Sequence, residues 1–418
     1  MVTRSLQLGM LAILGALLLH SQWVGAQNPA APAADTEAHR WQSVAPEVVG
    51  LVAAQLDAID RDISSGRYGF VDSLMVIRDG KIAYERYYNH DYSAIYAVEA
   101  RTPGPLVVTS PSGPYNYFNA FWHPYYKDTD LHSMQSVTKS IVSAVIGIAI
   151  DRGDFPDLDT PVLSFFQEGT VAAVDAQKRS MTLRDLLTMS AGWQWDEDVP
   201  YSDSSNTFAV MAKSRDWVQY TLDQSMARAP GTAFKYNSGA TLVLGHIFLQ
   251  ATGIDIEEYT VRHLFGPLGI KRYEWKRTPL GLADTQEGLF LSTRDLAKIA
   301  WLFREEGLWQ GNQVVPASWV RTSLAPSFEV NADGSEGYGY KWWSQNYSHA
   351  GQDYVAYLGE GFGGQRPIIL PEFDMVIVLT GWNILPDRPF FHRARGDCPG
   401  ADCGSPLVDF GAGVSGRQ

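Results

Sequence analysis

Apolar and polar residues follow two different periods along the chain, and each period predicts one type of element. From Pro46 the apolar residues Val49, Leu51, Val52, Leu56 and Ile59 recur at helical spacing, which predicts an amphipathic helix. Residues 73–77 and 81–84 are apolar runs on either side of Arg78-Asp79-Gly80, and Asp-Gly between two such runs is typical of a β-hairpin. Residues 367–370 and 375–379 flank Pro371-Glu372-Phe373-Asp374 in the same way and predict a second hairpin.

The pattern of apolar residues predicts mostly helices in the middle of the chain. Residues 136–150 are apolar on nearly every face, which predicts a helix buried on all sides. The same periodicity predicts further helices at about 183–189, 217–225, 240–251, 256–264 and 293–306. Strands near both ends with helices between them predict an α/β fold, in which a sheet from both chain ends carries an inserted, mostly helical subdomain at about 130–290.

One stretch fits neither period. Residues 93–130 form an aromatic-rich insertion, and Tyr115, Tyr117, Phe118, Phe121, Trp122, Tyr125 and Tyr126 crowd into its second half. Two interpretations stay open for these aromatic side chains. They either form an ordered loop packed on the surface, or a wall over a functional site.

The first 40 residues predict an exported protein. Arg4, the apolar run at 8–19 and the small residues Val24-Gly25-Ala26 have the order of a secretory signal peptide, here residues 1–26. The alternative is a membrane anchor, but the run is short for a helix that spans a bilayer. Residues 27–40 are rich in Pro and Ala and predict a disordered linker. We therefore expect a periplasmic or secreted protein, with no transmembrane segment after signal cleavage.

The predicted export bears on the two cysteines, because it would place them in an oxidising compartment. Cys398 and Cys403 lie in a Gly- and Pro-rich tail, residues 391–418, that follows the main domain at 41–390. An oxidising compartment favours a local disulfide between them, whereas a redox-active pair would need Cys-x-x-Cys spacing.

Composition narrows the classes of function. The chain of 418 residues has a formal net charge of -13, which argues against a nucleic-acid partner that needs a basic face. Nine histidines show no His-Glu-x-x-His pattern, and we expect no metal site. Gly359-Glu360-Gly361-Phe362-Gly363-Gly364 matches Gly-x-Gly-x-x-Gly, but it leads into a hairpin instead of a helix, which argues against a dinucleotide site. No cofactor is implied, and the oligomeric state is left open.

One nucleophile candidate stands out. Ser136-Val137-Thr138-Lys139 is the sole Ser-x-x-Lys string, and it opens the most apolar helix. The spacing places Lys139 on the face of Ser136, and apolar surroundings favour a neutral amine that can act as a base. The helix N-terminus supplies N–H groups for a developing oxyanion. The alternative is a capping serine with a surface lysine.

Two later segments complete a constellation. Tyr236-Asn237-Ser238 follows Pro230-Gly231, and its tyrosine could relay a proton from the nucleophile to the leaving group. Gly359-Glu360-Gly361-Phe362 enters the second hairpin, and we expect it to be an edge strand that donates a second backbone N–H.

Ser-x-x-Lys, Tyr-x-Ser and a Gly-rich strand, in this order, resemble the penicillin-recognising serine hydrolases. The chain is most similar to the branch with class C β-lactamases, β-lactamase-fold esterases and 6-aminohexanoate-dimer (nylon oligomer) hydrolases. The similarity runs from about residue 70 to 383 and includes residues 182–192, 292–298, 338–343 and 363–365. It implies a β-lactamase/DD-peptidase-like fold, with an antiparallel sheet flanked by helices.

The resemblance also implies roles. Ser136 would be the acylated nucleophile, Lys139 its base and Tyr236 the proton relay. The backbone N–H groups of Ser136 and Phe362 would form an oxyanion hole. Three further residues would bind substrate: Ser238, Tyr201 and Gly361.

The sequence departs from the family at the third element, where Gly359 stands at the position of a cation. The resemblance therefore implies a serine hydrolase for a small ester or amide. Two alternatives remain open: a true β-lactamase or DD-peptidase, and a penicillin-binding receptor-like module without turnover.

Overall fold

The computed structural model describes residues 41–385, except 103, 105, 108–115, 128, 350 and 351. The expected signal peptide, the linker, the C-terminal tail and the Cys398–Cys403 pair lie outside the described residues. The strands are β1 Val71–Arg78, β2 Lys81–Tyr87, β3 Leu131–Ser133, β4 Glu274–Trp275, β5 Leu289–Ser292, β6 Leu308–Trp309, β7 Asn312–Gln313, β8 Phe328–Glu329, β9 Glu336–Tyr338, β10 Trp343–His349, β11 Gln352–Leu358, β12 Arg366–Leu370 and β13 Met375–Gly381.

The helices lie mostly between the two groups of strands. They are α1 Ala53–Ser64, α2 Tyr92–Ile95, α3 Val137–Asp151, α4 Ala176–Ser180, α5 Leu183–Leu187, α6 Thr207–Lys213, α7 Trp217–Leu222, α8 Ser238–Thr252, α9 Ile256–Thr260, α10 Gly266–Leu268, α11 Thr293–Arg304 and α12 Ala317–Leu324. A π-helical turn, Val261–Phe265, joins α9 to α10.

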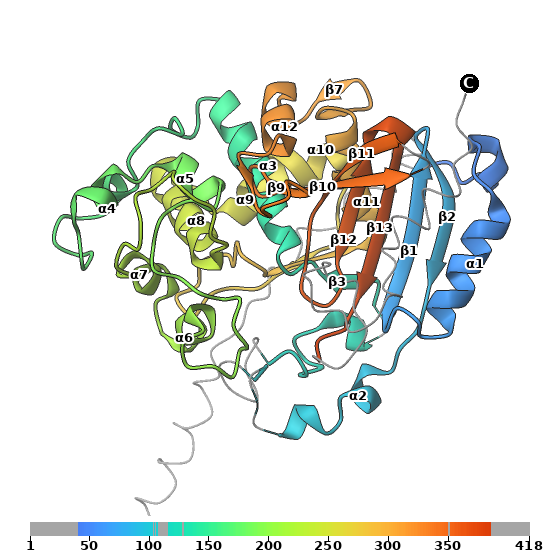
Figure 1. Ribbon diagram of the computed structural model, residues 1–418, viewed down its shortest axis with the longest axis horizontal. Helices are drawn as coiled ribbons and strands as arrows, with labels where there is room; N and C mark the ends of the chain where they lie inside the picture. Colours follow the sequence, from blue (N-terminus) through green and yellow to red (C-terminus); the bar gives the residue numbers. More distant parts are fainter. Residues whose placement is uncertain are drawn as a thin grey trace, which may run out of the picture. The chain divides into compact units, whose positions relative to one another are not determined.

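The main sheet draws on both ends of the described chain, as predicted. Its eight described strands run in the order β2-β1-β13-β12-β11-β10-β9-β8, and each neighbouring pair is antiparallel (Figure 1). The first hairpin meets the last one where β1 pairs with β13, for example Val76 with Ile377. Both predicted hairpins are therefore confirmed, and they are adjacent in space.

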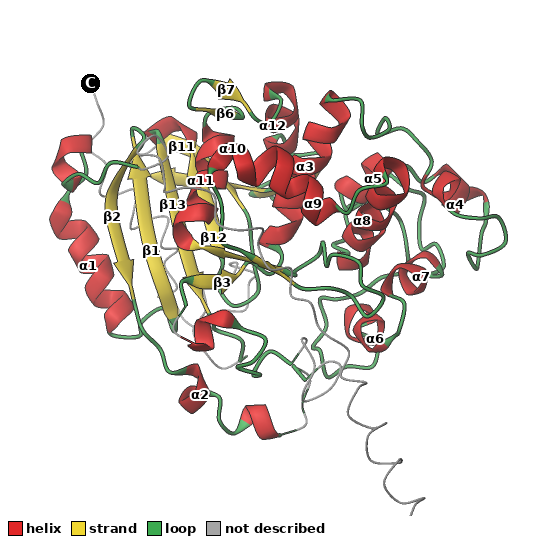
Figure 2. Ribbon diagram, turned by 180° about the vertical axis from the view of Figure 1, so that it is seen from behind, coloured by secondary structure: helices red, strands yellow, loops and turns green. Residues whose placement is uncertain are grey.

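Alternate residues of the central strands bury against different helices. Leu74 and Val76 on β1 belong to an apolar cluster with Leu56 and Ile59 of α1. Met75, between them in sequence, belongs to the larger cluster that contains α11 and α3. Since successive side chains of a strand point to opposite faces, α1 and α11 cover opposite faces of the sheet (Figure 2).

Helix α3 is buried along nearly its whole length. Every residue from Val137 to Ala149 is buried, which confirms the prediction from its apolar pattern. In Figure 1 it stands between the sheet and the group formed by α4 to α8. Its first turn begins next to the three-stranded sheet β3-β5-β4, where the Met134 N–H donates to the Leu289 carbonyl at 2.8 Å.

Two local expectations were wrong. The helix expected from Pro46 is split, because Gly50 adopts a left-handed φ of 73° that ends a 3₁₀ turn before α1 starts at Ala53. The segment 359–362 is not an edge strand. It belongs to the turn between β11 and β12, both of which have strand neighbours on either side.

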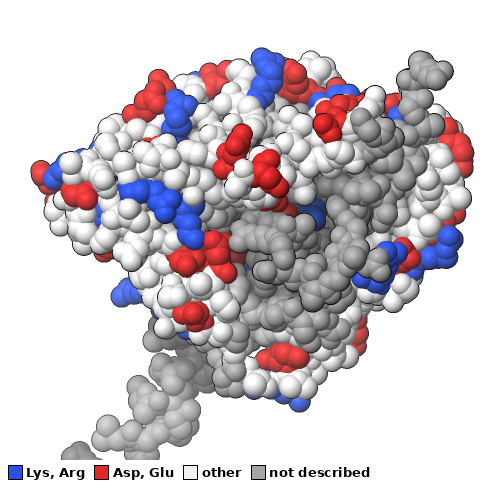
Figure 3. Space-filling model, in the orientation of Figure 1, with Lys and Arg blue, Asp and Glu red and all other residues white. Residues whose placement is uncertain are grey.

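Among the described residues, no single helix has the length and apolar character needed to cross a membrane. The pair Ser238–Thr252 and Ile256–Leu268 reaches that length and composition together, but it is bent by 80°. Most residues of the first of these helices are buried in the protein core. On the face shown in Figure 3, the Lys and Arg side chains of the described residues are interspersed with Asp and Glu.

Candidate active site

The Ser-x-x-Lys string lies at the start of α3. Ser136 occupies the N-cap position with φ -62° and ψ -12°, and its side chain makes no capping hydrogen bond. Lys139 is 1% exposed, and its Nζ lies 2.8 Å from Ser136 Oγ. The same Nζ donates to the Gln286 carbonyl at 2.9 Å. The arrangement is therefore not that of a capping serine beside a surface lysine.

Two backbone N–H groups near this serine have no acceptor among the described residues. Neither the Ser136 N–H nor the Phe362 N–H donates to an acceptor in the described part of the chain. Gly361 brings the second group close, because a Cβ at this position would lie 2.5 Å from the Met134 carbonyl oxygen. Only glycine allows so close an approach of two backbone segments.

The second element is held at the start of α8. Asn237 is the N-cap of α8, and its side chain accepts from the Ala240 N–H at 3.0 Å. The Tyr236 ring stacks on Trp343 of β10, with centroids 5.9 Å apart. Lys139 Nζ lies 5.2 Å from the centroid of the Tyr236 ring. The structure thus brings Ser136, Lys139 and Tyr236 together.

Ser238 faces a carboxylate that the sequence analysis did not identify. Its hydroxyl donates to Glu197 Oε1 at 2.8 Å, and its backbone N–H donates to Glu197 Oε2 at 3.0 Å. The Trp195 indole donates to the same Oε2 at 2.7 Å. The pKa of the Glu197 carboxyl is raised, because the effect of burial exceeds the opposing effects of Lys139 and of these hydrogen bonds.

The third element reaches α3 through a glycine. A Cβ at Gly359 would lie 3.2 Å from Val137 Cγ2, so the position where related enzymes carry a cation adjoins the first turn of the helix. Glu360 accepts from Arg366 Nη2 at 2.8 Å, and both side chains are largely buried, at 23% and 13% exposure. The nearest arginine in the sequence is therefore engaged in an ion pair.

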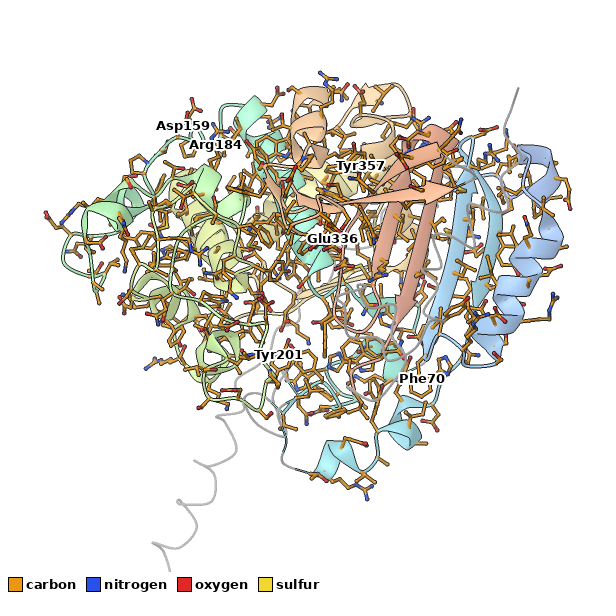
Figure 4. All side chains as sticks on the ribbon, viewed as in Figure 1. Phe70, Asp159, Arg184, Tyr201, Glu336 and Tyr357 are labelled. Carbon is orange, nitrogen blue, oxygen red and sulfur yellow. The ribbon has the colours of Figure 1, made fainter. Side chains whose placement is uncertain are left out.

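Aromatic rings border Phe362 on two sides. Tyr201, which lies on the loop before α6 (Figure 4), and Tyr117, from the aromatic insertion, each have a ring centroid 5.8 Å from that of Phe362. Burial, followed by the charges of Glu287 and Glu197, raises the pKa of Tyr201 well above its usual value. The Tyr201 side chain thus lies close to both carboxylates.

The aromatic insertion combines features of the two interpretations left open. Tyr117 and Phe118 are buried, and Tyr117 packs against Trp382 at the end of the sheet. Phe121, in contrast, is 66% exposed. The Tyr117 hydroxyl donates to both carboxylate oxygens of Glu287, at 3.0 and 3.1 Å. The segment is therefore packed core that also reaches the residues around the candidate nucleophile.

A rigid turn between β4 and β5 presents the carbonyl that binds Lys139. Asp284 Oδ1 accepts from the N–H groups of Gln286 and Glu287, at 3.0 and 3.3 Å. Burial and the charge of Asp284 raise the pKa of Glu287, while burial lowers the pKa of Lys276, its neighbour. The turn therefore sets both a hydrogen bond and a charge beside Lys139.

A second buried lysine lies behind the site. Lys341 is 2% exposed and donates to the Leu186 carbonyl at 2.5 Å. Burial and the charge of Lys139 lower its pKa well below the usual value. Its own carbonyl accepts from Ser140 Oγ at 2.6 Å, which joins the β9–β10 connection to α3.

The residues that the sequence analysis missed come from outside the three motifs. Glu197, Gln286 and Glu287 belong to no recognised spacing. Tyr117 lies in the aromatic insertion and Lys341 in segment 338–343, but neither residue had been given a role. Across the described ranges, no group of three or more His, Cys, Asp or Glu residues is arranged to hold a metal ion.

A curated protein is similar in sequence over much of the chain. Over 298 residues the chain is 28% identical to the 6-aminohexanoate-dimer hydrolase of Paenarthrobacter ureafaciens, which covers 66% of this chain and 71% of that protein.

Solved structures with similar folds are more distant in sequence. A Bacillus anthracis protein provisionally named a 6-aminohexanoate-dimer hydrolase has a TM-score of 0.60 at 19% identity and covers 84% of both chains. EstCE1, described as a hydrolase with promiscuous acyltransferase activity, has a TM-score of 0.60 at 13% identity and covers 89% of this chain and 99% of its own. A D-stereospecific amidohydrolase from Streptomyces sp. has a TM-score of 0.55 at 13% identity, covering 79% and 94%. These likenesses confirm the β-lactamase/DD-peptidase-like fold.

The assignment of the chain to a family rests on a match of its sequence to a family model. Residues 59–386 match the family described as Beta-lactamase, and this range includes all three motifs. The chain therefore belongs to the beta-lactamase family, whose members share the serine-hydrolase fold.

Proposed function

We propose that this chain is a serine hydrolase that cleaves an ester or amide through an acyl-enzyme intermediate on Ser136. The observation that carries the proposal is the 2.8 Å distance between Lys139 Nζ and Ser136 Oγ at the start of a buried helix. A buried amine at this distance can accept the serine proton when it is neutral.

Acylation would proceed in two proton transfers. Ser136 Oγ attacks the carbonyl carbon of the substrate, and its proton passes to Lys139 Nζ as the Oγ–C bond forms. The N–H groups of Ser136 and Phe362, which donate to no acceptor in the part of the chain that the structure describes, are the candidate donors to the resulting oxyanion. The proton then passes through the Tyr236 hydroxyl to the leaving nitrogen or oxygen, and the bond from carbon to the leaving group breaks.

Deacylation would use the same groups in reverse. A water molecule attacks the acyl carbonyl and gives its proton to Lys139 or Tyr236. The C–Oγ bond then breaks, Ser136 recovers a proton and the carboxylic acid product leaves. No metal or organic cofactor enters this scheme.

The environment of the third element favours substrates without a carboxylate beside the scissile bond. Gly359 offers no cation there, and Arg366 is already paired with Glu360. Tyr201 and Phe362 offer apolar ring surface, and with Ser238 and Gly361 they are the proposed substrate contacts. The 6-aminohexanoate-dimer hydrolase relative supports amides as well as esters as candidates.

A steady-state assay tests this function. Purified protein is expected to hydrolyse short-chain nitrophenyl esters. Ser136→Ala is expected to lose that turnover while remaining folded, since the Ser136 side chain makes no capping hydrogen bond that the substitution would remove. Retention of turnover in Ser136→Ala would contradict the proposal. Absence of both turnover and active-site labelling in the wild type would instead favour a receptor-like module.

We further propose that the protein works in the periplasm or outside the cell on small molecules. The support is the order of basic, apolar and small residues in segment 1–26. Detection of mature protein beginning near Gln27 in an exported fraction would test this localisation.

A further inference from the structure

Glu197 makes a compact set of contacts beside the three motifs. Its two carboxylate oxygens accept three hydrogen bonds, from Ser238 Oγ, the Ser238 N–H and the Trp195 indole. All three donors would be satisfied best by an ionised carboxylate, because the charged form has only acceptor atoms. Glu197 is separated from Ser238 by 41 positions in the sequence, so folding alone brings the two together.

The electrostatic contacts of Glu197 extend to the candidate base. Lys139 Nζ lies 5.2 Å from the centroid of the Tyr236 ring, and Ser238, two residues after Tyr236, donates to Glu197. Burial raises the pKa of Glu197, and the positive charge of Lys139 opposes that rise. Charge interactions are reciprocal, so an ionised Glu197 attracts a positive charge that develops on Lys139. No hydrogen bond joins the two groups in the described residues, and Ser238 lies beside both Glu197 and the motif that carries Tyr236.

We infer that Glu197 is a positioning residue that supplies the counter-charge for Lys139 when Lys139 takes up the serine proton, and that fixes Ser238 at the mouth of the second motif. This inference rests on the proposed acyl-enzyme function. Lys139 gains its positive charge as it takes up the serine proton, so a fixed negative charge stabilises the transition state more than the reactive ground state with a neutral Lys139.

Other charged groups face the same pair and must be held constant in a test. Lys341 lies close to both Lys139 and Glu197, and its own buried position disfavours a second positive charge. The remaining titratable groups near Lys139 or Glu197 are Glu287 of the β4–β5 turn, Tyr201 and Tyr236, with Asp284 and Lys276 beyond Glu287.

Glu197→Gln tests the charge with little change in shape. The amide oxygen can accept from Trp195 and the Ser238 N–H, and the NH2 group can donate to the Ser238 hydroxyl, which is able to accept. Without the negative charge, the acid limb of kcat/KM against pH is expected to move down by about one to two pH units. The plateau of kcat is expected to fall by about 10- to 100-fold, because the protonated base loses its counter-charge.

The direction of the shift separates the inference from a structural role. A residue that merely holds Ser238 in place would lower the plateau without moving the acid limb downward. Glu197→Asp keeps the charge, so its acid limb is expected to stay near that of the wild type even if its plateau falls. Asp198→Asn is the matched control, since this substitution removes the same charge from the same segment. The Asp198 side chain is 42% exposed and pairs with Lys235 at the surface.

The results for the Glu197 variants test the role of Glu197, and the result for Ser136→Ala tests the proposed acyl-enzyme function. An acid limb that moves down in Glu197→Gln, but not in Asp198→Asn or Glu197→Asp, supports the inference. An unchanged or raised acid limb in a Glu197→Gln variant with a normal melting temperature overturns the inference. Loss of both turnover and fluorophosphonate labelling in Glu197→Gln also overturns it, as does failure of both Glu197→Gln and Glu197→Asp to fold. Persistence of activity in Ser136→Ala would refute the acyl-enzyme function instead, which keeps the two failures distinct.

Discussion

Gly245, in the middle of α8, links the packing of a helix to the geometry around Lys139. A Cβ at this position would lie 2.6 Å from Thr285 Cγ2 and 2.9 Å from Thr285 Oγ1. Thr285 cannot simply rotate away, because its hydroxyl donates to the Thr241 carbonyl at 2.7 Å. Gly245→Ala must therefore push apart α8 and the turn that carries Gln286.

The size of the effect follows from these distances. Ordinary carbon contacts begin at 3.4 Å, so Thr285 Cγ2 has to move by about 0.8 Å. Overpacking of this kind costs about 1–3 kcal/mol, and the better helix propensity of alanine returns about 0.8–1.0 kcal/mol. We expect the free energy of unfolding to fall by no more than about 2 kcal/mol, which leaves the protein folded.

The effect on turnover is expected to be larger. The residue after Thr285 is Gln286, whose carbonyl accepts from Lys139 Nζ at 2.9 Å. A displacement approaching 1 Å in a catalytic constellation can cost up to about 100-fold in rate. We therefore expect kcat for a nitrophenyl ester to fall by about 10- to 100-fold in Gly245→Ala.

A second substitution provides the control. Thr285→Ala removes both atoms nearest to the added methyl group, so Gly245→Ala/Thr285→Ala is expected to recover most of the lost kcat, although it loses one hydrogen bond worth about 1 kcal/mol. Urea denaturation and ester kinetics on the single and double variants would measure both effects. A Gly245→Ala protein with kcat near that of the wild type would refute the coupling, and a double variant no better than the single would do the same.

Three further predictions concern the proton path and substrate selectivity. Lys139→Ala and Tyr236→Phe should each lower kcat by at least about 100-fold, and their effects in the double variant should be less than additive because both residues serve one proton path. A near-normal kcat in Tyr236→Phe would mean that the second motif is only a turn. Nitrocefin should be hydrolysed with a kcat/KM below that for neutral esters, because a charge-assisted hydrogen bond of about 1.5–3 kcal/mol to its carboxylate is missing. Glu360→Gln should raise nitrocefin turnover by about 10-fold, since it removes one negative charge and releases Arg366 from its ion pair. Nitrocefin kcat/KM at or above that for neutral esters in the wild type would promote the β-lactamase alternative.

The strongest local patterns predicted the elements that the structure contains. The two hairpins and α3 combine long apolar runs with clear turn residues, and all three were identified with their approximate bounds. Strands β10 and β11 were not predicted, because their sequences mix polar and aromatic residues without a clean alternation. Their pairing with each other and with β9 and β12 defines them, and local sequence does not encode that pairing.

In the candidate site, too, local patterns were predictable from the sequence and long-range contacts were not. Ser136 and Lys139 are three residues apart on one helix, so local spacing predicted their proximity. Glu197 and Glu287 reach the site from loops far from the motifs, and their proximity depends on the tertiary fold. The position of segment 359–362 was misjudged for the same reason, since the order of strands in a sheet follows from long-range pairing.

The central claim is that Ser136 becomes covalently acylated, and the intact mass of the protein after reaction with a fluorophosphonate probe tests it most directly. One adduct per chain is expected in the wild type, located by peptide mapping to Ser136 in the segment that begins α3. Ser136→Ala should carry no adduct, while Asp198→Asn should react as the wild type does. An adduct that persists in Ser136→Ala, or that maps to another residue of the wild type, would contradict the account.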